Sequence, residues 1–266
     1  MAAAVNLWHK HMKKFFRNRE AAFGMLLQPI LWVALFGIGM QAMMQMGGGM
    51  GGGGERFGGS YLGFMVPGII AFSALSGAIA GGATLLDERL RGIVKEYLVA
   101  PIPRYSILLG NALSTVTKGL FQVVVIVAIG LAFGSRLGGS VPGWIGGLAL
   151  ITLYGLGVAG LALAVAAKVN STLGYHGLIA LNLPLLFASN ALYPADVLPG
   201  WMQWVVRLNP TTYVIDGVRR MMYGIITPDQ AGVWLSLGVV TAFALLGMGL
   251  AVLAFRGTVS QRGGAV

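Results

Sequence analysis

Cysteine is absent from this chain of 266 residues, and charged residues are scarce. Without cysteine there is no disulfide, no thiolate nucleophile and no cysteine-bound metal. Only 10% of the residues are charged, whereas soluble domains carry roughly 25%. Hydrophobic residues make up 56% of the chain, in several runs near the ~20 residues that a spanning helix needs. The sequence therefore predicts an all-α integral membrane protein.

Motifs of several protein classes are also missing. There is no G-x-x-x-x-G-K-[ST] phosphate loop, so the chain does not bind ATP by that route. No serine stands in a G-x-S-x-G turn and no histidine lies within a hydrophobic run, which argues against an intramembrane hydrolase. The runs carry no Asp or Glu for a pore filter, so a passive channel is the less favoured alternative. We expect no catalytic residue, no metal site and no cofactor bound by this chain.

Six hydrophobic runs predict six transmembrane helices between two short terminal segments. The domain boundaries are an amphipathic helix at 1–20, a six-span domain at 21–255 and a cytosolic tail at 256–266. Pro29 predicts a kink in the first span. A glycine-rich connection at 44–60 follows that span, and it has the composition of a flexible linker. The spans are expected at about 21–43, 61–86, 106–133, 143–167, 177–192 and 232–255.

The basic residues predict the orientation. An even number of spans places both termini on one side, and that side carries twelve Lys and Arg residues against five on the other. Loops with more Lys and Arg face the cytoplasm. We therefore expect the N-terminus, the loop after the second span and the C-terminus in the cytoplasm of a bacterial or archaeal plasma membrane.

Two segments outside the spans have helical patterns of their own. At 1–20, basic residues alternate with Leu7, Trp8 and Phe15 in the pattern of a basic amphipathic helix at the membrane interface. At 87–104, apolar residues recur at helical spacing among four basic residues, and Pro101 ends the pattern. This second segment predicts a short helix on the cytoplasmic surface.

The fifth span is short, and the segment that follows it is broken by prolines. Prolines at 194, 199 and 210 separate short helical patterns between 193 and 231. Backbone that dips back into a bilayer is tolerated only where protein or a cavity covers it. We expect an external re-entrant hairpin here. Asp196, Asp216 and Asp229 stand near enough in sequence to pair with the nearby arginines.

Three features in this order resemble the membrane permease subunit of a type-2 ATP-binding-cassette (ABC) exporter, over essentially the whole chain. They are the basic arm before the first span, the Glu88–Pro101 segment, and the segment from Tyr193-Pro194 through Asn209-Pro210 to Arg219. Exporters of drugs, polyketides and nodulation factors have this organisation. Ile93 departs from the family pattern, which more often has threonine there.

The resemblance implies roles for two groups of residues. The Glu88–Pro101 segment would be a coupling helix that docks on a separate ATP-binding subunit, and the Tyr193–Arg220 segment would close the exit. The implied coupling residues are Glu88, Arg91, Gly92, Glu96, Leu98 and Pro101. The implied gate residues are Tyr193, Pro194, Pro199, Trp201, Asn209, Pro210, Tyr213, Asp216 and Arg219.

The residues inside the spans suggest a path for cargo. Lys118 lies within the third span, where a lysine either faces a polar cavity or extends toward the cytosolic headgroups. Asn182 and Pro184 are the polar and helix-breaking residues of the fifth span. We expect a hydrophobic or amphipathic small molecule or lipid as cargo, with a lipid-linked glycan as the alternative. The implied partners are two ATPase subunits, which bind ATP and Mg, and a second copy of the permease.

Overall fold

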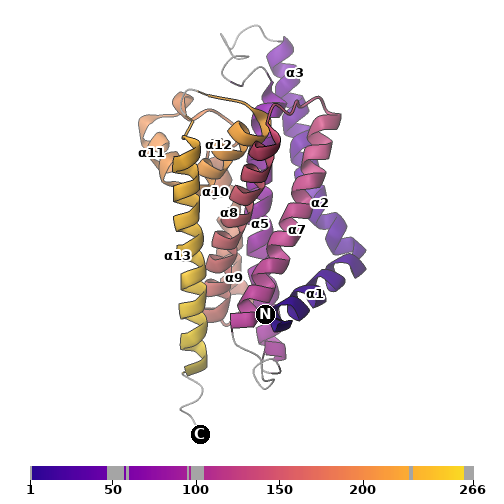
Figure 1. The fold of residues 1–266 in the computed structure, drawn as a ribbon, viewed down its shortest axis with the longest axis vertical. Coiled ribbons are helices and arrows are strands. Elements are labelled where there is room, and N and C mark those ends of the chain that lie inside the picture. Colours follow the sequence, from indigo (N-terminus) through magenta and orange to yellow (C-terminus); the bar gives the residue numbers. More distant parts are fainter. Residues whose placement is uncertain are drawn as a thin grey trace.

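The computed structural model describes residues 2–46, 57, 60–94, 96, 105–227 and 230–260. All regular elements in these ranges are helices. The long helices lie side by side in an elongated bundle, and α1 begins at the same end of the bundle at which α13 finishes (Figure 1). We call this the inner end and the opposite end the outer end. Most of the predicted loop at 44–60 and half of the predicted helix at 87–104 lie outside the described residues.

The helices follow the predicted runs closely. In chain order they are α1 (Ala2–Arg17), α2 (Arg19–Leu31), the π-helix η1 (Trp32–Gly37), α3 (Ile38–Met46), α5 (Tyr61–Leu90), α7 (Tyr105–Ala132), α8 (Val141–Lys168), α9 (Thr172–Ala180), α10 (Asn182–Phe187), the 3-10 helix η2 (Ala195–Val197), α11 (Gly200–Leu208), α12 (Pro210–Tyr223) and α13 (Val233–Ser260).

Five helical stretches in the described residues are long and apolar enough to cross a membrane. They are Phe23–Met43, Tyr61–Leu90, Ser106–Ala132, Val141–Lys168 and Val233–Phe255. The fifth predicted span, 177–192, is not one continuous helix. The helical structure in this region begins earlier, at Thr172, and is interrupted at Leu181 between α9 and α10. Pro184 explains the break, because it has no N–H for the carbonyl of Ala180 and its ring crowds that carbonyl.

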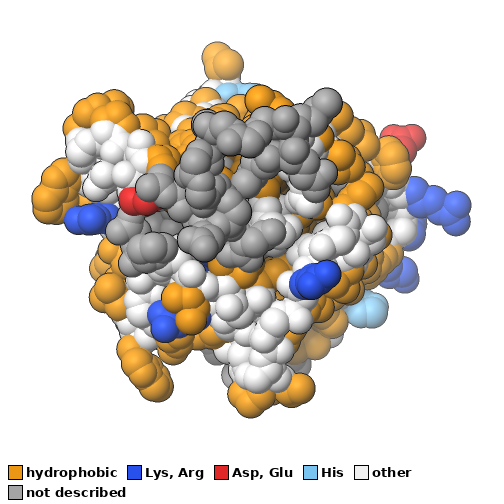
Figure 2. Space-filling model, turned by 90° about the horizontal axis from the view of Figure 1, so that it is seen from above, with side chains coloured by type: hydrophobic (Ala, Val, Ile, Leu, Met, Phe, Trp, Pro, Cys, Tyr) orange, Lys and Arg blue, Asp and Glu red, His pale blue; other side chains and the backbone are white. Residues whose placement is uncertain are grey.

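Helix α5 lies at the centre of the bundle. In its most apolar stretch 89% of the residues are buried, against 17% in the first span. Ser60 caps its first turn by accepting a hydrogen bond from the amide of Gly63 at 3.3 Å. It packs against α7, α8, α12 and the π-helix η1. Seen from the outer end, hydrophobic side chains lie around much of the rim, as on a surface that faces lipid (Figure 2).

Helix α1 packs on the bundle through its apolar face. Leu7, Met12 and Phe15 are buried, and the indole of Trp8 donates to the hydroxyl of Thr117 in α7 at 3.0 Å. The sequence predicted this helix but assigned its apolar face to the membrane interface. The structure places part of that face on α7, and Val5 and Phe16 remain exposed.

Pro29 leaves one carbonyl of the first span without its helical partner, and α7 supplies a replacement. Proline has no N–H, so the carbonyl of Met25, four residues earlier, loses the donor that an uninterrupted helix would give it. The side-chain amide of Gln122 donates to this carbonyl at 2.8 Å. The π-helix η1 starts three residues after Pro29. At the kink predicted for Pro29, the structure has the proline followed by a π-helical turn, and the hydrogen bond from Gln122 joins this region to α7.

Glycine allows α8 and α13 to approach backbone to backbone. A Cβ on Gly247 would lie 2.1 Å from the carbonyl oxygen of Gly157, and a Cβ on Gly160 would lie 2.3 Å from the backbone of Gly247. Small residues at such crossings let helices pack closely in membranes.

We expect Gly247→Ala to separate α8 from α13 and to lower the free energy of unfolding by about 1–3 kcal/mol, the usual cost of overpacking. Gly249→Ala is the matched control, because nothing lies within 4 Å of a Cβ at that position of the same helix. Thermal unfolding of the purified chain in detergent measures both. Equal melting temperatures for the two variants would contradict the close contact.

We also expect Gln122→Leu to destabilise the chain by about 0.6–1.7 kcal/mol, the range for hydrogen bonds between membrane helices. In a Pro29→Ala background the cost should be smaller, because alanine at this position supplies the missing N–H to the carbonyl of Met25. A double-mutant cycle of unfolding free energies tests this. Additive effects of the two substitutions would show that Gln122 does not compensate for the proline.

Candidate functional site

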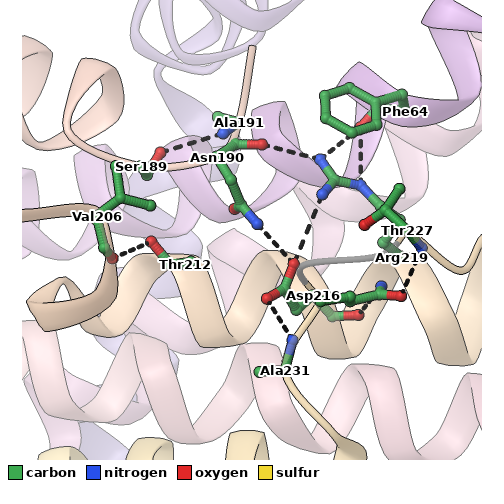
Figure 3. Close-up of polar contacts among 11 residues, drawn as sticks. Phe64, Ser189, Asn190, Ala191, Val206, Thr212, Asp216, Arg219, Thr227 and Ala231 are labelled. Atoms are coloured by element: carbon green, nitrogen blue, oxygen red, sulfur yellow. Dashed lines mark hydrogen bonds and ion pairs between the residues drawn. The ribbon is translucent and has the colours of Figure 1, made fainter. Parts of the chain in front are cut away.

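The outer end holds a buried charged network, which we call the outer polar cluster: Phe64, Asn190, Asp216 and Arg219 (Figure 3). Arg219 is fully buried, with 0% of its surface exposed. Its guanidinium donates to the carbonyl of Phe64 through Nε at 3.3 Å and Nη2 at 3.0 Å. Nη2 also donates to the carbonyl of Asn190 at 3.0 Å. The guanidinium carbon lies 3.7 Å from the centre of the Phe64 ring, a cation–π contact.

Asp216 balances the charge of Arg219. One carboxylate oxygen lies 3.6 Å from Nη1 of Arg219 and accepts from the side-chain amide of Asn190 at 2.6 Å. The other accepts from the amide of Ala231 at 2.9 Å. The sequence predicted pairing of Asp216 with a nearby arginine, and the structure confirms the pair with Arg219. Asp229, for which the same prediction was made, lies outside the described residues.

The outer polar cluster joins four segments that are far apart in the chain. Arg219 and Asp216 belong to α12, Asn190 follows α10, Phe64 belongs to α5 and Ala231 precedes α13 (Figure 3). A buried ion pair is stable only where further hydrogen bonds satisfy its remaining atoms. The cluster therefore holds its geometry only while the segment after α10 and helix α12 both lie on α5.

The first turns of α5 are suited to this contact. Pro67 has no N–H for the carbonyl of Gly63, and Arg219 binds the neighbouring carbonyl, that of Phe64. Gly68 lets the chain after α10 pass close by, since a Cβ there would lie 2.8 Å from the backbone of Ala191. The hydroxyl of Tyr61 donates to the carbonyl of Leu192 at 3.2 Å.

The other predicted gate residues shape the turns around the cluster. Asn209 caps α12 by accepting from Thr211 at 3.0 Å, and its amide donates to the carbonyls of Leu185 and Ala188 at 2.9 and 2.8 Å. Pro210 occupies the first turn of α12, where no N–H is needed.

Two tyrosines and two prolines border the connecting turns. Tyr213 donates to the carbonyl of Arg207 at 2.8 Å, and Tyr193 donates to the carbonyl of Phe187. Pro194 and Pro199 precede η2 and α11.

Helix α11 turns apolar side chains outward. Trp201 is 70% exposed, and Trp204 and Leu208 are similarly exposed. Tryptophan is enriched at membrane–water interfaces. An amphipathic helix with exposed tryptophans at the outer end fits that position.

At the inner end, the last turn of α5 is fixed on two sides. Glu88 is buried at 3% exposure and lies 3.4 Å from the amine of Lys10 in α1. Arg89 donates to the carbonyl of Ala166 in α8 at 2.6 Å, to that of Ala167, and to the side chain of Asn170 at 2.6 Å. A cation at the carbonyl end of α8 also interacts favourably with the helix dipole. The 91–104 segment therefore follows an end of α5 that is held in place by these contacts.

His11 lies near this anchor on α1. Burial lowers the pKa of His11, and the charges of Lys118, Lys10 and Lys14 lower it further, while Glu88 raises it. His11 is therefore neutral at pH 7, and Lys10 is the partner that compensates Glu88.

The predicted coupling segment does not begin as a separate helix, because its first residues belong to α5. Helix α5 continues to Leu90, and Gly92 adopts a φ of +83° in the turn that follows. That left-handed conformation explains a glycine here, and no atom of the described residues lies within 4 Å of a Cβ built on Gly92. Arg91 pairs with Asp87 at 2.8 Å and is exposed, as is Glu96. Leu98 and Pro101 lie outside the described residues.

The structure does not bring the three predicted path residues together. The amine of Lys118 lies 5.5 Å from the ring centre of Phe15 in α1. Asn182 donates to the hydroxyl of Ser76 in α5 at 2.7 Å, and its Oδ1 is buried without a hydrogen bond. Pro184 accepts from the amide of Ala188 at 2.8 Å. Lys118 thus faces α1, whereas Asn182 faces α5.

The sequence did not predict the contacts of three residues. Arg89 is only one of several basic residues at 87–104, Phe64 is one apolar residue among many, and no role was predicted for Gln122. A signal was present for Gln122, because an amide side chain within a long apolar run needs a hydrogen-bond partner.

We expect Arg219→Met to lower the free energy of unfolding by about 3–5 kcal/mol, because Asp216 would stay buried without its cation. Arg220→Met is the control: Arg220 is the next residue of α12 and is only partly buried. Its loss should cost less than about 1 kcal/mol. Melting temperatures in detergent distinguish the two, and an equal small effect of both would contradict the charge balance described here.

Comparison with known proteins agrees with this architecture. Residues 3–223 match the family model described as ABC-2 type transporter. The chain is 33% identical over 197 residues to the transport permease ycf38 of Cyanophora paradoxa, covering 73% of this chain and 65% of that protein. It therefore spans about two thirds of the length of that relative.

Two bacterial relatives extend the match. The daunorubicin resistance ABC transporter permease protein DrrB1 of Streptomyces coeruleorubidus is 29% identical over 199 residues, 71% of this chain and 68% of that protein. The inner membrane transport permease YadH of Escherichia coli K12 is 28% identical over 244 residues, 91% of this chain and 90% of that protein. With its membrane-length helices, the chain belongs to the ABC-2 type transporter family of membrane permeases.

Proposed function

We propose that this chain is the permease subunit of an ATP-driven exporter, in which two permeases work with two separate ATPase subunits. Membership of the ABC-2 family and relatives named as permeases support this. ATP and Mg would be bound by the ATPase subunit, since the sequence has no phosphate-loop motif. The chain itself would do no chemistry and would provide the route through a bacterial or archaeal plasma membrane.

In this proposal α9, α10 and the following residues form a sixth crossing. The stretch Thr172–Phe187 reaches about 24 Å at 1.5 Å per residue, less than the ~30 Å of a bilayer core. The buried segment after α10 supplies the rest. An even number of crossings agrees with α1 beginning and α13 finishing at the inner end (Figure 1). The excess of basic residues on that side supports a cytoplasmic inner end.

One observation carries the mechanism: α5 is a single helix connected at both ends to the elements that would move. Its inner end is anchored to α1 by Glu88 and to α8 by Arg89. Its outer end receives Arg219 from α12. A push on the 91–104 segment by the ATPase would therefore reach the outer polar cluster through α5. Opening of the segment between α10 and α13 would then release cargo outside.

The cargo we favour is a hydrophobic or amphipathic small molecule or lipid. The spans are apolar, and one relative is named for resistance to daunorubicin. Export of a lipid-linked glycan is the alternative, and a passive channel is less favoured because the spans have no acidic filter.

Replacing Arg91 and Glu96 by alanine tests the coupling role, because both side chains are exposed and their loss leaves the anchor intact. We expect about tenfold weaker association with the ATPase subunit and a matching loss of ATP-driven transport, with normal levels in the membrane. Lys168→Ala, an exposed cation at the inner end of α8, is the control. Wild-type association and transport in the double variant would reject docking at this segment.

A further inference from the structure

The corner between α1 and α2 carries a basic hollow on its outward side. The helices meet at Asn18, and an open hollow of about 890 Å³ lies over the corner. Its lining includes Lys10, Lys13, Lys14, Arg17, Arg19 and Glu20. Lys10 also pairs with Glu88, so the other four cations and Glu20 leave this surface with a net positive charge. Seen from the outer end, Lys and Arg side chains project at the side where the α1–α2 corner lies (Figures 1 and 2).

The hollow faces outward because the other side of α1 is occupied. Leu7, Met12 and Phe15 are buried on α7, so much of the apolar face of α1 is covered, whereas Val5 and Phe16 remain exposed. The surface that α1 leaves uncovered therefore combines these two apolar side chains with the exposed cations of the hollow. The membrane-length stretch starts at Phe23, about one turn after Arg19. The cations thus lie at the depth where lipid headgroups begin.

An apolar hollow continues along the same helix. It has a volume of about 370 Å³ and is lined by Gly24, Leu27, Gln28, Leu31, Leu35 and Phe36, together with Trp32. These positions recur every three or four residues and so share one face of the helix. The rings of Trp32 and Phe36 lie 4.9 Å apart at its far end. From Gly24 to Phe36 the helix rises about 18 Å, close to the ~15 Å depth of one leaflet.

We propose that these two hollows form one site for an anionic membrane phospholipid, with its phosphate in the basic hollow and one acyl chain along 24–36. The charge and the apolar length fit the two parts of such a lipid. A second copy of this chain is a poor occupant, because a two-fold contact would place one basic corner against another. The assignment does not depend on which cargo the permease moves.

Native mass spectrometry of the full chain in detergent tests the site, with phosphatidylglycerol and phosphatidylcholine of identical acyl chains as probes. We expect phosphatidylglycerol to bind at least tenfold more tightly than phosphatidylcholine. Lys13→Gln with Arg17→Gln should weaken phosphatidylglycerol roughly 30-fold, since each cation near an anionic headgroup contributes about a factor of five. The control is Arg136→Gln with Lys168→Gln, two exposed cations elsewhere.

A second pair of variants tests the acyl-chain groove. Gly24→Leu should weaken both lipids by filling the groove, whereas Gly39→Leu should weaken neither. Both glycines are exposed in helices of the first span with nothing within 4 Å of a Cβ, so both variants should fold. Soluble glycerol phosphate should not compete at millimolar concentration. Equal binding of the two lipids, equal losses in variants and controls, or full competition by glycerol phosphate would each overturn the lipid site.

Discussion

The buried guanidinium of Arg219 is the constraint on which the outer half of this permease depends. A charge without solvent must find its counter-ion and its hydrogen-bond acceptors within the protein. Here the counter-ion comes from the same helix, and the acceptors come from α5 and from the chain after α10. These elements can separate only if the arginine is hydrated or given other partners. Burial of one side chain thus favours either the full set of contacts between the segment from α10 to α13 and α5, or none of them.

Two backbone carbonyls of the long helices are bound by polar side chains from other helices. The carbonyl of Met25, which Pro29 leaves without its helical donor, is satisfied by Gln122. The carbonyl of Phe64 in α5 accepts from Arg219. Because lipid offers no hydrogen bonds, such a pairing is specific. It fixes which helices are neighbours where apolar packing alone would allow several arrangements.

Much of this structure was predictable from sequence, within clear limits. Hydrophobic runs located the five long helices, and the nearness of Asp216 to several arginines in sequence indicated a pair without showing which arginine forms it. The contact between Arg219 and Phe64 joins residues 155 positions apart, which no local pattern reveals. Glu88 was expected on an exposed docking helix, yet α5 extends far enough to bury it against Lys10. Charge identifies a polar residue, but only tertiary packing decides whether it faces water or a partner.

In the proposed mechanism the segment between α10 and α13 moves away from α5, and from α8 that packs on α5, when the ATPase subunit binds nucleotide. The most direct measurement is the distance between spin labels at Trp201 in α11 and Val141 at the outer end of α8, both exposed positions. The account predicts one distance distribution without nucleotide and a longer one with ATP trapped in the assembled transporter. An identical distribution in both states would contradict it.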